Sequence, residues 1–290
     1  MLQVLSIIFP VFAIVLAGLL YAHWRGADMA SANRLNLEVF TPALIFSVLS
    51  TEGLDLAIYT DLALAGTLIV LGSGLLAWPI ARLAGWSRRV FLPPIMFSNS
   101  GNMGLPLALF AFGPAGLPAA MILFLVENIL HFTVGNAMLA RRVHPIALLR
   151  MPMLIATLAG IGVSLAQLTI PKPVHQAVDL LGQIAIPLML FSLGVRMKGI
   201  VLSDWRIGLA GALLAPLIGL LLAGMAVVGM EMPEQQAAQL ILFGALPPAV
   251  LNFLLAERYS VQPNQVAAIV LLGNLASVLI IPAVLYYLLR

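Results

Sequence analysis

Apolar residues run through this sequence in long stretches, and the short segments between these stretches hold most of the charged residues. The apolar stretches are 19 to 26 residues long, and an α-helix needs about 20 residues to cross the hydrocarbon core of a bilayer. The pattern therefore predicts an all-α integral membrane protein with ten transmembrane helices and no sizeable soluble domain. The ten predicted spans are residues 3–24, 30–50, 57–82, 89–112, 116–140, 150–168, 175–196, 205–229, 235–256 and 264–289.

The composition agrees with this prediction and excludes several classes of site. Hydrophobic residues make up 62% of the chain and charged residues only 9%, whereas soluble domains are about 45–50% apolar and about 25% charged. There is no cysteine, so a disulfide framework, a thiolate metal site and a cysteine nucleophile are all excluded. The sequence contains no HExxH, GxSxG or GxxxxGK[ST] motif, so we expect neither an enzyme nor a bound cofactor or metal.

The basic residues predict how the chain is oriented. If the N-terminus lies outside, 12 of the 14 Lys and Arg residues fall in inside segments and only Lys172 and Arg290 lie outside. Loops on the cytoplasmic side of a membrane protein are rich in Lys and Arg. We therefore expect a multi-pass protein of the inner (plasma) membrane with both termini periplasmic or extracellular. The basic residues are scattered among loops, so the pI of about 9.6 gives no reason to expect nucleic acid as a partner.

The two halves of the chain share weak but colinear matches, which indicate an internal repeat. The offsets grow slowly from 142 to 146 residues: Leu16-Ala17-Gly18 matches Leu158-Ala159-Gly160, Phe46-Ser47 matches Phe191-Ser192, and Asn128 matches Asn274. Each half has five predicted spans, and this odd number places the second copy upside down in the membrane. The sequence thus predicts a 5+5 inverted-topology repeat, with residues 1–140 as the first copy, 141–149 as a cytoplasmic linker and 150–290 as the second copy.

The segment Phe97–Pro106, with sequence FSNSGNMGLP, is a polar interruption inside the span 89–112. Gly101 and Gly104 weaken a helix, and Pro106 removes a backbone donor. At the repeat-related position in span 235–256, Pro247 and Pro248 stand in the sequence GALPPAVLN. Both spans are therefore predicted to be broken helices, and non-helical backbone at membrane depth is tolerated only where it is buried in protein or lines a cavity.

A pair of such breaks predicts a binding site for an anion. Half-helices beginning near Gly104 and Pro248 would point their N-termini, with their positive partial charge, at the same region. Polar side chains beside the breaks could bind a carboxylate: the amides of Asn99, Asn102 and Asn252 and the hydroxyls of Ser98 and Ser100. The alternative is that these residues only kink the helices and pack them together.

Glu127 and His131 lie four residues apart in span 116–140, on one face of the predicted helix. A carboxylate inside the membrane is costly unless it is protonated, paired or hydrated. We expect Glu127, with His131, to exchange H+ or bind Na+ as the coupling ion; the alternative is a buried Glu–His hydrogen bond that locks this span to its neighbour. Asn128, Asn274 and Asp61 are further candidates for the ion pathway.

The sequence resembles the auxin efflux carrier family of membrane transport proteins, including bacterial members assigned to malonate and related acids. The resemblance rests on Asn99-Ser-Gly-Asn-Met-Gly-Leu-Pro106, Phe112-Gly113, Gly116-Leu117, Asn128, Pro247-Pro248 and Glu257-Arg-Tyr259. It implies a scaffold of spans 1, 2, 6 and 7, a moving transport unit of spans 3–5 and 8–10, and broken helices that cross at spans 4 and 9. It also implies that Asn99 binds the carboxylate of the substrate.

These observations predict a secondary active transporter that moves a small organic anion across the inner membrane by an elevator-like form of alternating access, in symport with H+ or Na+ if it is coupled. The expected partners are the anion, the lipid bilayer and, through the scaffold helices, a second copy in a homodimer. Two other functions stay open: a passive anion uniporter or channel, and a membrane sensor or scaffold that transports nothing.

Overall fold

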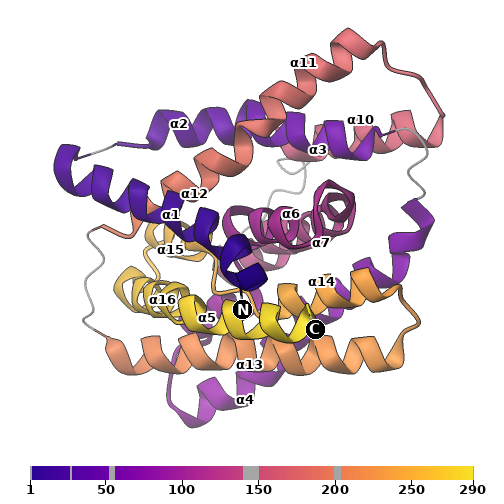
Figure 1. Cartoon of the computed structure of the whole chain (residues 1–290). Coiled ribbons are helices and arrows are strands. Elements are labelled where there is room, and N and C mark those ends of the chain that lie inside the picture. Colours follow the sequence, from indigo (N-terminus) through magenta and orange to yellow (C-terminus); the bar gives the residue numbers. More distant parts are fainter. Residues whose placement is uncertain (1, 27, 52–55, 140–149, 199–203, 290) are drawn as a thin grey trace. The chain divides into compact units, whose positions relative to one another are not determined.

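A computed structural model describes residues 2–26, 28–51, 56–139, 150–198 and 204–289 of the 290-residue chain. The predicted linker 141–149 lies outside these residues. Helices make up nearly all of the described structure, and the sole extended pairing in it is one isolated β-bridge. The prediction of an all-α protein is confirmed (Figure 1).

Six of the described helices are long and apolar enough to cross a membrane. They are Val4–Arg25, Ala57–Leu83, Pro114–Leu139, Lys172–Arg196, Trp205–Gly229 and Pro263–Leu288. Two shorter apolar helices, Ser100–Phe112 and Pro152–Leu165, accompany them. The chain is therefore an integral, multi-pass membrane protein, while the count of ten spans and the inverted repeat stay predictions.

The helices form two compact units, which we describe separately. Unit 2 contains α1 from Pro10 onward, together with α2, α3, α10, α11 and α12. The bounds of its elements are α1 (Leu2–Arg25), α2 (Ala30–Leu35), the π-helix η1 (Asn36–Phe40), α3 (Thr41–Leu49), α10 (Pro152–Leu165), α11 (Lys172–Gln183) and α12 (Ala185–Arg196).

Glycines let the helices of unit 2 approach one another closely. Gly18 of α1 lies against the backbone carbonyl of Phe191 in α12, so a Cβ at position 18 would overlap that oxygen. Gly160 of α10 approaches α3 in a similar way, and a Cβ there would lie 3.5 Å from the carbonyl oxygen of Phe46. Gly18 and Gly160 stand at matching positions of the predicted repeat, as do Phe191 and Phe46, so the two halves make comparable contacts at these positions, although the approach at Gly18 is the closer one.

Two hydrogen bonds in unit 2 are repeat-related as well. Ser47 of α3 donates to a carboxylate oxygen of Asp179 in α11 at 3.1 Å. Its sequence match, Ser192 of α12, donates to the side-chain oxygen of Asn33 in α2 at 2.5 Å. Hydrogen bonds between helices stabilise membrane proteins by about 1 kcal/mol each, so these two bonds help to fix the arrangement of α3 with α11 and of α12 with α2.

A larger residue at Gly194 is expected to destabilise unit 2. A Cβ at this position in α12 would overlap the carbonyl oxygen of Val15 in α1 and lie 2.8 Å from the backbone nitrogen of Leu19. Overpacking costs about 1–3 kcal/mol and more where backbone must move, so Gly194→Leu should lower the melting temperature of the purified protein by several degrees. Gly162→Leu in α10 is the matched control, because a Cβ there would meet nothing within 4 Å. Equal melting temperatures for the two variants would contradict this packing.

Unit 1 contains the remaining helices and the start of α1 up to Phe9. The bounds of its elements are α4 (Thr60–Leu83), α5 (Arg88–Met96), the π-helix η3 (Ser100–Gly104), α6 (Leu105–Phe112), the 3-10 turn η4 (Pro114–Gly116), α7 (Leu117–Leu130), the π-helix η5 (His131–Gly135), α8 (Asn136–Leu139), α13 (Trp205–Gly229), α14 (Glu234–Gly244), α15 (Val250–Arg258) and α16 (Pro263–Leu288). The turn η2 (Leu56–Tyr59) precedes α4.

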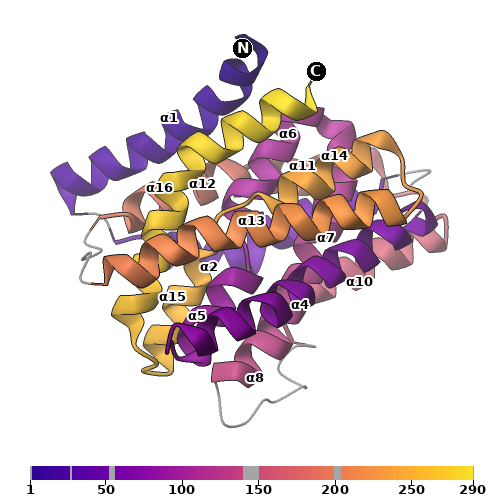
Figure 2. The same cartoon turned by 90° about the horizontal axis from the view of Figure 1, so that it is seen from below.

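Helix α13 packs along α16 and also contacts α4 and α14 (Figure 2). At the contact with α14, a Cβ on Gly219 would overlap the carbonyl oxygen of Gly244, so the two backbones touch. Gly244 is the last residue of α14. This contact therefore holds the end of α14 in place at the point where the helix stops.

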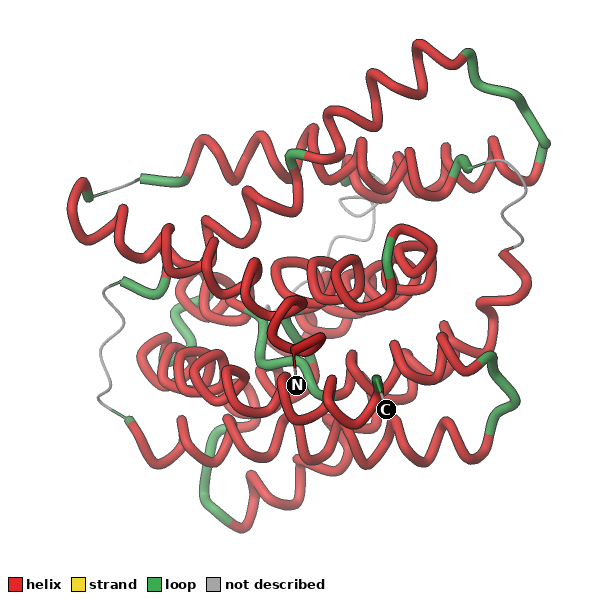
Figure 3. Tube along the Cα trace, in the orientation of Figure 1, coloured by secondary structure: helices red, strands yellow, loops and turns green. Residues whose placement is uncertain are grey.

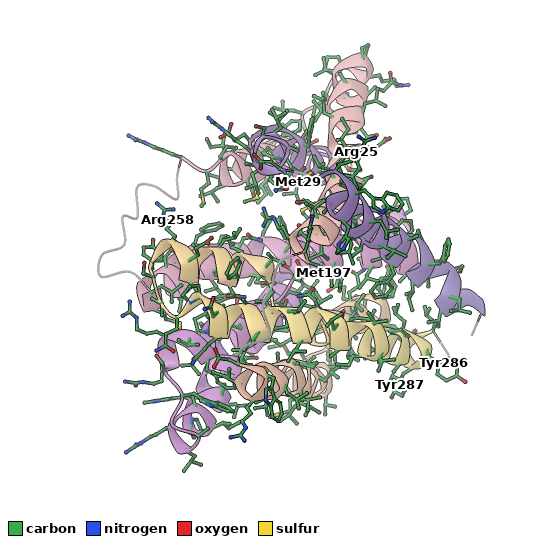
Figure 4. All side chains as sticks on the ribbon, turned by 90° about the vertical axis from the view of Figure 1, so that its left-hand side faces the viewer. Arg25, Met29, Met197, Arg258, Tyr286 and Tyr287 are labelled. Atoms are coloured by element: carbon green, nitrogen blue, oxygen red, sulfur yellow. The ribbon has the colours of Figure 1, made fainter. Side chains whose placement is uncertain are left out.

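The pair α15–α16 has different side chains at its two ends. Figure 4 shows Arg258 at one end of this pair, and Tyr286 and Tyr287 at the other. Aromatic residues are enriched where helices leave the membrane, and Arg and Lys are enriched on the cytoplasmic side. The arrangement is typical of a helix pair that crosses the whole bilayer.

Candidate functional site

Two helix interruptions meet inside unit 1. The first, Phe97–Asn99, separates α5 from η3, and the second, Ala245–Ala249, separates α14 from α15; in Figure 3 both are drawn green between red helices. Ser98 and Pro248 form an isolated antiparallel β-bridge. The N–H of Asn99 donates to the carbonyl of Pro247 at 2.7 Å, and the N–H of Ala249 donates to the carbonyl of Phe97 at 3.0 Å. The two chains therefore satisfy each other's backbone groups.

Pro247 and Pro248 have no N–H with which to continue the helical hydrogen bonds of α14, and so favour the second interruption. The first interruption starts earlier than the glycines suggest. Gly101 and Gly104 lie inside the π-helix η3, and Pro106 lies in the first turn of α6, which continues η3 without a break. The residues that leave the helix are Phe97 to Asn99, because their backbone groups pair with the second interrupted segment.

We call the two paired segments, Phe97–Asn99 and Ala245–Ala249, the crossing. Three buried asparagines surround it, with 1% to 5% of their surface exposed. The amide of Asn252 donates to the carbonyls of Phe97 at 2.9 Å and Ala249 at 3.0 Å. The amide of Asn274 donates to the carbonyls of Pro248 at 3.0 Å and Val270 at 2.8 Å. Asn274 also accepts a bond of 3.3 Å from the amide of Asn99. Each amide nitrogen has two donor hydrogens, so Asn252 and Asn274 have none left and Asn99 has one.

The number of free donor hydrogens decides which of the predicted asparagines can bind an anion. Asn252 offers a ligand only its oxygen, which lies close to the side chain of His131 and would repel a carboxylate. Asn99 keeps one donor for a ligand. Asn102 lies half-buried in η3, and its amide makes no hydrogen bond to the described part of the crossing. The structure therefore leaves Asn99 and Asn102 as the asparagines able to donate to an anion.

Replacing Asn252 with alanine is expected to loosen the crossing. Its amide connects carbonyls on both interrupted segments, and each buried group left without a partner costs about 1–3 kcal/mol. Asn252→Ala should therefore lower the melting temperature of the purified protein markedly. Asn264→Ala, at an exposed position in the first turn of α16, should not change it. If both variants melt like the wild type, Asn252 does not hold the crossing together.

Glu127 is 2% exposed and lies in α7 beside the crossing. The hydroxyl of Ser98 donates to its carboxylate at 3.0 Å. The backbone N–H of Ser98 and the hydroxyl of Ser100 also interact with this carboxylate. The only ion pair found in the described residues is elsewhere, between Arg34 and Glu38 in unit 2. Glu127 thus has polar partners but no cationic one.

The repeat-related position on the other side of the crossing has no acid. At an offset of 146 residues, Glu127 corresponds to Gly273 of α16, and a Cβ on Gly273 would lie 2.5 Å from the ring of Pro248. Ser98 and Pro248 are the two residues of the β-bridge. Glu127 thus contacts one residue of the bridge, Ser98, while Gly273, its match in the predicted repeat, contacts the other, Pro248.

His131 is 2% exposed in η5 and stacks on Phe97, with the ring centroids 4.1 Å apart and the planes tilted by only 4°. Its side chain lies close to that of Asn252. Nε2 has no hydrogen-bond partner among the described residues. Glu127 is bonded to serines, so the Glu–His hydrogen bond proposed as its structural alternative is not among the described interactions.

Two predicted residues lie apart from the crossing. Asn128 is half-buried, and its amide donates at 2.8 Å to the carbonyl of Phe124, four residues earlier in its own helix. Asp61 is exposed in the first turn of α4, five residues before Gly66, which packs on Leu123 of α7. Asp61 thus lies near the start of its helix and is exposed, whereas Glu127 is buried beside the crossing.

The structure brings one unpredicted side chain to the crossing. Gln239 of α14 is 3% exposed and, with Ser100, lines a cavity of about 20 Å³ beside η3. Neither its amide oxygen nor its amide nitrogen has a hydrogen-bond partner among the described residues. A glutamine within an apolar span is the signal in the sequence that could have identified it.

Comparison with known proteins supports a role in transport. The sequence profile of the family described as "Membrane transport protein" matches residues 3–148 and 138–286, nearly the whole chain. A protein of Rhizobium meliloti (strain 1021) named "Putative malonate transporter" is 27% identical, and the match covers 99% of this chain and 96% of that protein. Both point to a membrane transporter and not to an enzyme. The resemblance to the auxin efflux carriers is thus confirmed, and the chain belongs to their family of membrane transport proteins.

Proposed function

We propose that this protein is a secondary transporter that moves a small carboxylate across the inner membrane by alternating access. The observation that carries the proposal is the crossing of two interrupted helices within one compact unit, surrounded by buried amide and hydroxyl groups. Transporters commonly bind their substrates where discontinuous helices meet near the middle of the bilayer. Family membership supports the general class, and the name of the relative supports malonate or a similar acid as the first substrate to test.

The anion would bind at the helix starts beside the crossing. Both η3, which continues into α6, and α15 begin directly after an interruption, so their first N–H groups face this region. Helix N-termini attract anions through these N–H groups and the helix dipole. The spare donor of Asn99 and the amide of Asn102 add side-chain hydrogen bonds to the carboxylate. Ser98 and Ser100 lie at the same place, but Glu127 already engages their hydroxyls.

The two units support an elevator-like mechanism. Unit 2 holds most of predicted spans 1, 2, 6 and 7, and unit 1 holds predicted spans 3–5 and 8–10 with the whole crossing. In our proposal unit 2 is the scaffold, and unit 1 carries the anion across. The repeat-related contacts of Gly18 with Phe191 and of Gly160 with Phe46 support the inverted repeat on which the ten-span topology rests.

The same topology predicts that both termini face the periplasm. Arg258 at the inner end of the α15–α16 pair, with Tyr286 and Tyr287 at the outer end, agrees with this orientation. A homodimer through the helices of unit 2 stays a prediction, which the mass of the purified protein in detergent would test.

Counterflow in proteoliposomes tests the carrier function. Vesicles loaded with unlabelled malonate should take up labelled malonate faster than empty vesicles, because a carrier returns faster when loaded and a channel does not. Equal uptake by loaded and empty vesicles would favour the passive channel. Binding without any flux would favour the sensor or scaffold.

A further inference from the structure

The cavity beside η3 has room for one small molecule. Its volume is about 20 Å³, and a cavity of roughly 10–15 Å³ or more can hold a water molecule. The residues that line it come from η3, α6, α7, α14 and the segment after α14: Ser100, Gly104, Ala108, Ala120, Leu123, Gln239, Leu242, Phe243 and Leu246. Only two of these side chains, those of Ser100 and Gln239, are polar.

The amide of Gln239 needs a partner that the described protein does not supply. Burial of an unpaired amide is unfavourable in proteins, and Gln239 is 3% exposed with both amide atoms unpaired among the described residues. A partner must accept from the nitrogen or donate to the oxygen, and water does both. A hard cation prefers about six oxygen ligands, whereas this lining offers two side-chain oxygens. The cavity therefore suits water better than Na+.

Ser100 connects this cavity to the buried acid. Its hydroxyl interacts with the carboxylate of Glu127 and also lines the cavity. A hydroxyl has one donor and two acceptor positions. While its hydrogen points at Glu127, its oxygen can accept a hydrogen bond from a water in the cavity. Gln239, the water, Ser100 and Glu127 would then form one continuous hydrogen-bonded chain.

We propose that this cavity is a water site on a proton path to Glu127, and that the ion coupled to anion transport is H+. This inference rests on the carrier function proposed above and extends it. When Glu127 is ionised, an excess proton on the water passes to the oxygen of Ser100 while the hydroxyl proton of Ser100 passes to the carboxylate; release reverses both transfers, with Glu127 donating to Ser100 and Ser100 to the water. Each O–H bond breaks as the next one forms, and Gln239 holds the water without changing its own protonation. Gln239 is thus a positioning residue.

Glu127 is the acid best placed for this exchange. His131 lies one turn further along the chain from Glu127, and its ring is stacked on Phe97. The charged residues of the surrounding helices lie at or near helix ends: Asp61, Arg82, Arg88, Arg89, Arg206, Glu234, Glu257 and Arg258. Helices α6 and α16 contain no charged residue.

Proteoliposomes with a pH-sensitive dye inside test the proposal, with malonate as the probe. In the wild type, an inside-alkaline pH gradient should drive malonate uptake and the interior should acidify, while a Na+ gradient should drive none. In Gln239→Leu, net uptake driven by the pH gradient should fall about tenfold, which corresponds to about 1.4 kcal/mol, because the water loses the hydrogen bond that holds it in the cavity. Binding of malonate and exchange of malonate for malonate should persist in this variant, since neither needs net proton movement. Gln235→Leu, an exposed position on the same helix, should behave like the wild type.

Several outcomes would overturn the proposal. Gln239→Leu could lose exchange and net uptake equally, or it could keep its pH-driven uptake unchanged. Uptake by the wild type could also follow a Na+ gradient without acidification of the interior. If the wild type moves no malonate, the carrier function with this acid fails, and infrared spectroscopy still tests the water site. The C=O band of the protonated Glu127 carboxyl group is assigned by its absence in Glu127→Gln. After transfer to D₂O, this band should shift more slowly in Gln239→Leu than in the wild type. Equal rates would refute the proton path.

Discussion

Replacement of Asn99 by alanine is expected to weaken malonate binding about ten- to hundredfold, because a hydrogen bond to a charged group contributes roughly 1.5–3 kcal/mol. Asn99 is 3% exposed and donates to the side-chain oxygen of Asn274 at 3.3 Å. Its second donor hydrogen remains for a ligand, whereas the donors of Asn252 and Asn274 are taken by backbone carbonyls. Isothermal titration calorimetry on the purified protein measures the change in Kd.

Asn128→Ala is the matched control for this experiment. Asn128 corresponds to Asn274 in the repeat, but its amide donates only to the carbonyl of Phe124 in its own helix. We expect wild-type affinity in this variant. Asn99→Asp should bind malonate even more weakly than Asn99→Ala, because it adds a negative charge beside the anion. An unchanged Kd in Asn99→Ala would show that the anion binds elsewhere.

Local sequence predicted the breaks in the two helices, though not their geometry. Pro247 and Pro248 each remove a backbone donor and so favour a break, which makes the second interruption predictable from the sequence. Proline alone does not decide it, because the adjacent prolines Pro93 and Pro94 lie within α5. The first interruption was predicted around Gly101 and Gly104, yet the residues that leave the helix are Phe97 to Asn99. Their backbone groups pair with a segment about 150 residues later. No local pattern indicates such a partner, and the partner decides which residues leave the helix.

The same reason limits what could be predicted about the site. Asn252 looks like a ligand-binding amide in sequence, but a carbonyl 155 positions away uses one of its donors. Gln239 stands in an ordinary helical stretch, and its importance comes from a cavity bounded by segments that are distant in sequence. In contrast, Glu127 could be identified directly, because an acid inside an apolar span is costly in any fold. Residue chemistry is therefore visible in the sequence, and hydrogen-bond partnership is visible only in the structure.

Replacement of Glu127 by glutamine is expected to abolish pH-driven accumulation of malonate while leaving exchange of malonate for malonate active. The glutamine amide oxygen can still accept the 3.0 Å bond that Ser98 donates to the carboxylate. It cannot take up or release a proton, however, so the link between proton movement and anion movement is lost. Net uptake should then follow only the malonate gradient and show no response to an imposed pH difference. The measurement is labelled malonate uptake at several pH gradients, with internal acidification recorded in parallel.

Glu257→Gln provides the control, because Glu257 is exposed near the end of α15. It should retain the pH response of the wild type. Glu127→Leu separates proton exchange from structure: it leaves Ser98 and Ser100 without their buried acceptor, which costs about 1–3 kcal/mol per group, so it should lower the melting temperature as well as the coupling. If Glu127→Gln accumulated malonate under a pH gradient as the wild type does, the proton would move by another route. The asymmetry between Glu127 and its repeat counterpart Gly273 would then reflect packing of the crossing alone.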